Sequence, residues 1–80
     1  MIKGDRMSDI ITLEISTDEA IVFYDWLKRF NEKEDNLFND QAEERVLWDL
    51  EALLEKNLLA PFKENYNEIL QQARSRVRDV

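Results

Sequence analysis

Acidic side chains are the main candidates for chemistry in this chain, and many of them lie between residues 32 and 44. If Glu32 is counted as the first position of a calcium-binding loop, oxygen-bearing side chains fall at loop positions 1, 3, 5, 9 and 12, as in an EF-hand. The sixth position, where the loop requires glycine for its sharp turn, is Leu37. We therefore interpret the segment as a solvated acidic surface and predict no metal site. This surface comprises Glu32, Glu34, Asp35, Asp40, Glu43 and Glu44.

Other catalytic and cofactor-binding chemistry is restricted by the residue types that the chain lacks. It has no His, no Cys and a single Gly, which excludes imidazole bases, thiolate nucleophiles, thiolate zinc sites and glycine-rich phosphate loops. Adjacent carboxylates such as Glu43 and Glu44 fall on a face that helical periodicity predicts to be solvated. We predict no catalytic residues and no cofactor. The enzymatic alternative would have to act through carboxylates or through Tyr24 and Tyr66.

Length and composition indicate one small globular domain. The 80 residues are 44% hydrophobic and 36% charged, and 18 acidic against 11 basic side chains give a net charge of −7. Such a charge disfavours nucleic acid as a partner. Neither a membrane-spanning run nor a signal peptide is recognisable, so we expect a cytoplasmic protein that does not enter a membrane. Residues 1–8 are interpreted as a disordered or vector-derived leader, and residues 9–80 as a single helical domain.

The element expected first is a β-strand over about residues 10–16, where apolar and polar side chains alternate. Ile11, Leu13 and Ile15 would share one face of this strand. No other segment alternates well enough to pair with it, and an unpaired strand leaves backbone donors and acceptors unsatisfied. We therefore expect the strand to pair across a homodimer or with another protein.

Helical periodicity predicts three helices after the strand, which gives a mainly α fold with one short strand in the order β-α-α-α. Each helix follows a residue whose side chain can cap it, namely Ser16, Asp40 or Asn65. An acidic residue lies three positions after each cap, as a capping box requires. Pro61 is expected to end the second helix. The predicted helices span about residues 17–30, 40–59 and 65–78, and the second is expected to be central.

A wide apolar stripe on the first helix predicts that its aromatic side chains are buried, with Asp18, Asp25 and Arg29 on the solvated side. The alternative is a ligand groove lined by Trp26 and Tyr24. The predicted core consists of Leu13, Ile15, Phe23, Leu27, Phe30, Val46, Leu50, Leu53, Leu54, Ile69, Leu70 and Val77.

A second, narrow apolar face is expected on the back of the second helix, formed by Trp48, Ala52 and Leu59. Its partner is left open between an element of the same chain and a second subunit, and an isolated exposed tryptophan would also be ordinary. The strand and this face together supply the interface candidates Ile11, Leu13, Ile15, Trp48, Ala52 and Leu59.

Basic residues gather at the C-terminal end, where the last predicted helix carries Arg74, Arg76 and Arg78. Cations are favoured at a helix C-terminus because they interact with its dipole and exposed carbonyls, and we interpret the three arginines in this way. The alternative is contact with the acidic body of a second subunit or of another partner.

Residues 40–51, together with Ala60-Pro61-Phe62 and Asn65-Tyr66, resemble a group of small stand-alone bacterial proteins of unknown function. The resemblance extends over about residues 7–78. It implies a bacterial single-domain protein, and it implies no catalytic or binding residue.

The sequence therefore favours a non-enzymatic protein-interaction module that forms a homodimer. The alternative is an acidic inhibitor or immunity-type protein that covers a basic site on a larger partner.

Overall fold

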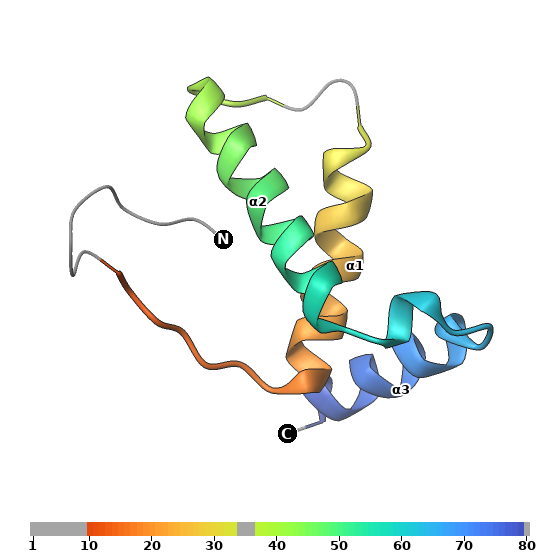
Figure 1. The fold of residues 1–80 in the computed structure, drawn as a ribbon. Coiled ribbons are helices and arrows are strands. Elements are labelled where there is room, and N and C mark those ends of the chain that lie inside the picture. The colour runs from red at the N-terminus through yellow and green to blue at the C-terminus, as the bar shows by residue number, and fades with distance from the viewer. Residues whose placement is uncertain (1–9, 34–36, 80) are drawn as a thin grey trace.

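The computed structural model describes residues 10–33 and 37–79, and this part of the chain is mainly helical, as predicted (Figure 1). Three α-helices are present, α1 (Thr17–Asn31), α2 (Gln41–Asn57) and α3 (Tyr66–Arg78), with a short 3-10 helix, η1 (Ala60–Phe62), between α2 and α3. The helix bounds agree with the predicted ones to within two residues. The expected leader, residues 1–8, lies outside the described residues.

Residues 10–16, which we call the arm, form neither helix nor strand and lead away from the helices (Figure 1). Ile11 is 88% exposed, Leu13 83% and Ile15 50%, so the prediction that Leu13 and Ile15 belong to the core is wrong. Within the single chain, the described residues contain no strand that could pair with the arm. Strand pairing with a second copy therefore stays a prediction.

Local side-chain caps begin the first two helices as predicted. Ser16 Oγ accepts a hydrogen bond from the Glu19 amide at 3.0 Å, and Glu19 Oε1 accepts one from the Ser16 amide at 2.8 Å, which completes a capping box. At α2, Asp40 Oδ1 accepts from the Ala42 amide at 2.7 Å. Both caps satisfy amides that have no partner inside the helix.

Three predictions about helix ends are wrong in detail. Glu43 accepts from the amide of Asn39 at 2.9 Å, not from that of Asp40, so the second capping box does not form. Asn65 makes no side-chain cap, and only its carbonyl accepts from the amide of Ile69. Helix α2 ends before Pro61 is reached, and the proline instead occupies the first turn of η1, where its missing N–H is not needed.

Helix α1, not α2, is the central helix. It packs against α2 on one side and against α3 on the other, whereas α2 and α3 share few contacts (Figure 1). Ala20 on α1 and Ala73 on α3 are both buried, and such small side chains allow the two helices to approach closely. The length and hydrophobicity of the second helix had suggested that it was central, but it packs along one side only.

The core lies mainly where α1, α3 and the end of α2 meet. Leu27 and Leu70 are buried as predicted, whereas Phe23, Val46 and Val77 are 36–42% exposed and were wrongly placed in the core. The other predicted core residues, Phe30, Leu50, Leu53, Leu54 and Ile69, are partly buried. The buried residues are Ala20, Ile21, Tyr24, Leu27, Leu58, Ala60, Leu70 and Ala73. Helix α2 itself contains no buried residue.

Candidate interaction surface

A stripe of aromatic side chains runs along α1 beside its contact with α2. Phe23, Trp26 and Phe30 recur at three- and four-residue intervals, so they lie on one side of the helix. The rings of Trp26 and Phe30 stack with centroids 4.9 Å apart. Phe23 is nevertheless 36% exposed and Trp26 44% exposed. We call these three residues the aromatic stripe.

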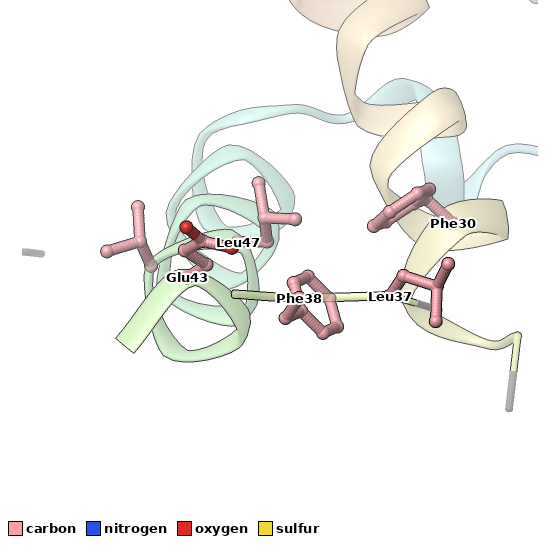
Figure 2. A pocket seen from close by; sticks show the side chains of 6 residues that line it. Phe30, Leu37, Phe38, Glu43 and Leu47 are labelled. Carbon is pink, nitrogen blue, oxygen red and sulfur yellow. The ribbon is translucent and has the colours of Figure 1, made fainter. Parts of the chain in front are cut away.

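The stripe leads into an open groove of about 450 Å³ between the C-terminal end of α1 and the N-terminal end of α2 (Figure 2). The two helices diverge toward the loop that connects them (Figure 1), and Phe38 from this loop lies between them. Its ring meets that of Phe30 edge-on, with centroids 5.9 Å apart. The groove is lined by Phe30, Leu37, Phe38, Glu43, Val46 and Leu47.

The groove walls are chemically suited to apolar side chains. Glu43 is the one charged lining residue, and its carboxylate already accepts the Asn39 amide. Leu37 is 96% exposed and Val46 is 42% exposed, so much apolar surface faces solvent here. The lining contains no nucleophile and no cationic group. Such a groove can bind an apolar segment by burial and shape, with little contribution from charge.

An asparagine fixes the spacing of the two helices behind the groove. Asn31 Nδ2 donates to the carbonyl of Leu47 at 3.3 Å and to Glu51 Oε1 at 2.8 Å, which joins the end of α1 to the middle of α2. Glu51 is therefore partly buried at the contact between α1 and α2. The Oδ1 atom of Asn31 is buried without a hydrogen-bond partner.

The six interface candidates from the sequence are all exposed, and they belong to the arm, to α2 and to the turn that follows α2. Trp48 is 50% exposed and Leu59 76%, and Ala52 is exposed as well. Helical geometry places Trp48 and Ala52 on the side of α2 away from Val46, and thus away from the groove. Leu59 lies in the turn after α2, not on the helix.

Two residues of the predicted acidic surface, Asp40 and Glu43, accept backbone amides at the start of α2. Glu32, Asp40 and Glu43 are exposed and Glu44 is partly buried, while Glu34 and Asp35 lie outside the described residues. Asp40 and Glu43 accept backbone amides at the helix start, where negative charge is also favoured by the helix dipole. No cluster of acidic side chains suited to a metal ion occurs within residues 10–33 and 37–79.

Ion pairs join α1 to α3, and they correct two predictions. Asp25 accepts from Tyr66 Oη at 2.9 Å, from Arg29 Nε at 2.9 Å and from Arg74 Nη2 at 3.3 Å. Its side chain is only 14% exposed, so it does not lie on a solvated side of α1. Burial and the hydrogen bond to Asp25 hold the pKa of the Tyr66 phenol well above its usual range.

A second ion pair lies nearer the N-terminal end of α1. Asp18 accepts from Arg76 Nε at 2.8 Å and from Arg76 Nη2 at 3.0 Å, and this hydrogen bonding lowers the pKa of the Asp18 carboxyl. Arg74 and Arg76 thus bind α1 of the same chain, a contact that the sequence did not predict. Arg76 and Arg78 lie in the last turn of α3, as the first interpretation expected. Arg78 donates to Ser75 Oγ at 3.2 Å near the end of α3.

Sequence reasoning missed the groove and the aromatic stripe because it predicts that Val46 and the aromatic side chains of the first helix are buried. The suggested ligand groove of Trp26 and Tyr24 is also wrong, since Tyr24 is buried at 4% exposure, away from the half-exposed Trp26. The sequence feature that could have indicated an exposed apolar surface is the width of the apolar stripe on the first helix. One partner helix covers only part of such a stripe, and the remainder stays exposed.

No protein-family model, curated protein or solved structure matches this chain significantly. Among the described residues, no helix is long and apolar enough to cross a membrane.

Proposed function

We propose that this protein is a cytoplasmic, non-enzymatic protein-interaction module that forms a homodimer. One observation carries the proposal. Within residues 10–33 and 37–79, twelve large apolar side chains are at least 36% exposed, whereas the core contains eight buried apolar residues. A domain of this size gains little stability from one small core, and association is a common way to bury the remaining apolar surface.

The surfaces available for this association are the arm, with Ile11, Leu13 and Ile15, and the back of α2, with Trp48 and Ala52. The adjacent Leu59 adds a further exposed apolar side chain. The arm has the most exposed side chains of these candidates, and its trace leads away from the helices (Figure 1). It is therefore the first surface to test.

Light scattering after size-exclusion chromatography tests the homodimer. We expect a mass near 19 kDa, twice the 9.6 kDa of one chain, at high protein concentration. Ile11→Lys/Ile15→Lys should shift the mass to that of a monomer, because it places charge on the apolar side of the arm. Thr12→Lys, on the other side of the arm, is the control and should leave the dimer intact. A monomer at every concentration contradicts the proposal.

The second candidate function is that of an acidic inhibitor that covers a basic site on a larger protein. The net charge of −7 and the exposed carboxylates of Glu32, Asp40 and Glu43 favour it. Exposed charges are screened over about 8–10 Å at physiological ionic strength, so added salt should slow this association steeply. Self-association through apolar surfaces should instead persist, since salt screens the repulsion between two acidic copies. A partner that is acidic or insensitive to salt contradicts the inhibitor function.

A further inference from the structure

We propose that the arm of one copy binds in the groove of a second copy, so that a reciprocal dimer forms by exchange of arms. This inference rests on the proposed homodimer and specifies its two contacting surfaces. It differs from the pairing of two arms as strands and from contact through the back of α2.

The arm has the chemistry of a groove-binding segment. Extended backbone sends every second side chain to the same side, about 6.6 Å apart, which places Ile11, Leu13 and Ile15 in one row. The residue next to α1, Ser16, has the extended backbone angles φ −71° and ψ 163°. Glu14 is the one charged residue between positions 10 and 16, so the arm is weakly charged in an otherwise strongly acidic chain.

The groove matches this segment in size and polarity. Its volume of about 450 Å³ exceeds the roughly 150 Å³ of a cavity that holds benzene, so it has room for more than one aliphatic side chain. Phe30, Phe38 and Leu47 form apolar walls (Figure 2), and Val46 on α2 also lines the groove. Binding an aliphatic row here would cover apolar surface on both partners without burying an unpaired charge.

The length of α1 favours exchange over binding within one chain. Phe30 lies 13 residues beyond Thr17, which is about 20 Å along the helix. Leu13 lies four residues before Thr17 and its backbone can extend only about 13 Å from there, so the backbones of Leu13 and Ile15 fall short of the level of Phe30 in their own chain. Two copies with antiparallel α1 helices bring the start of each α1 beside the groove of the other.

This arrangement also covers the aromatic stripe, because antiparallel α1 helices place Phe23 and Trp26 of one copy near those of the other. If the exposed parts of the arm, stripe and groove rim were all covered, they would supply on the order of 800 Å² per chain, comparable to the area that each partner buries in a standard protein interface. The contributing residues are Ile11, Leu13, Ile15, Phe23, Trp26, Leu37 and Val46.

Disulfide crosslinking tests the exchange directly, because the chain has no cysteine of its own. Leu13→Cys protein is mixed with isotopically labelled Val46→Cys protein, and mild oxidation is followed by mass spectrometry. We expect the disulfide between positions 13 and 46 of different chains to be the dominant product. Ala52→Cys, on the other side of α2, replaces Val46→Cys as the matched control and should give little crosslink to position 13.

Other products identify which statement fails. A dominant link between two Leu13→Cys chains, or between positions 13 and 52, overturns the exchange while a 19 kDa mass still supports the homodimer. An intramolecular disulfide in the Leu13→Cys/Val46→Cys double variant at low concentration also overturns it. A 9.6 kDa mass for the unmodified chain at every concentration, with no crosslink, overturns both proposals.

A second variant checks the groove without a cysteine. Val46→Lys places a charge on the groove rim and should shift the mass from about 19 kDa to 9.6 kDa. Ala52→Lys introduces the same charge about 120° around the same helix from position 46 and should leave the dimer mass unchanged. Circular dichroism confirms that each variant is folded. A dimer that survives Val46→Lys but not Ala52→Lys contradicts the exchange and places the interface on the back of α2.

Discussion

The two sides of α1 are joined to their neighbours in different ways. Toward α3, buried Ala20, Ile21 and Ala73 are accompanied by ion pairs from Asp18 and Asp25. Leu27 of α1 is fully buried as well, whereas the aromatic stripe beside α2 and the groove stay open to solvent. Both contacts involve α1, so the two sides differ in how completely their apolar side chains are covered from solvent.

This difference separates stability from interaction. At the α1–α3 junction, apolar groups are covered and polar groups have partners, so a further molecule would gain little by binding there. At the groove end, Phe38 packs on Phe30 and the hydrogen bonds of Asn31 join α1 to α2, yet Leu37 and Val46 remain exposed. Such a surface can bind a partner with little reorganisation of its own.

The largest expected effect concerns the closed core. Leu27 is fully buried, so Leu27→Ala should reduce the free energy of unfolding by about 3 kcal/mol through lost burial and the cavity left behind. Leu37→Ala, at a side chain that is 96% exposed, should change it by less than about 0.5 kcal/mol. Urea unfolding at low protein concentration measures both. Similar losses in the two variants would remove the distinction between a closed and an open region.

The next effect concerns the ionic part of the α1–α3 junction. Asp25→Ala removes the common acceptor of Tyr66, Arg29 and Arg74, and should cost about 2 kcal/mol in the free energy of unfolding. Asp49→Ala, at a partly buried position on α2, is the control and should change stability by less than about 0.5 kcal/mol. If Asp25→Ala unfolds at the same urea concentration as the unmodified protein, these hydrogen bonds do not stabilise the junction.

A smaller effect is expected from pH. The pKa of Tyr66 is raised in the folded protein, so the unfolded chain releases this proton first as the pH rises past 10. The contribution of Tyr66 to the free energy of unfolding is therefore complete below pH 10 and is lost progressively above it. Tyr66→Phe should cost about 1 kcal/mol at neutral pH and should weaken the alkaline loss of stability.

Part of the alkaline loss should persist in that variant, because burial also raises the pKa of Tyr24. Urea unfolding between pH 8 and 11 measures the dependence. An unchanged alkaline slope in Tyr66→Phe would contradict the role assigned to the phenol at this junction.

The smallest expected effect is a shift in tryptophan fluorescence, which compares the groove side of the molecule with the back of α2. In Trp48→Phe the remaining Trp26 should emit at shorter wavelength as rising concentration drives arm exchange, because its 44% exposed ring becomes covered. In Trp26→Phe the remaining Trp48, on the other side of the molecule's second helix, should show no such shift. The opposite pattern would place the interface at Trp48.

The sequence by itself determined the helices and most of their starts. Ser16 with Glu19, and Asp40, cap α1 and α2 as predicted, because a cap depends on residues only two or three positions apart. The buried positions Leu27 and Leu70 were also predicted, since both lie at the centre of an apolar stripe. Local spacing was sufficient for these features.

Only the tertiary structure decided which helix is central and which apolar side chains remain exposed. The stripe that holds Leu27 also holds Trp26, and the relative positions of α2 and α3 determine that the first is buried and the second is half-exposed. The partners of Arg74 and Arg76 are likewise 49 and 58 residues away in the chain. The physical reason is that a helical pattern specifies how side chains are distributed around one axis, whereas burial and ion pairing depend on where the other axes lie.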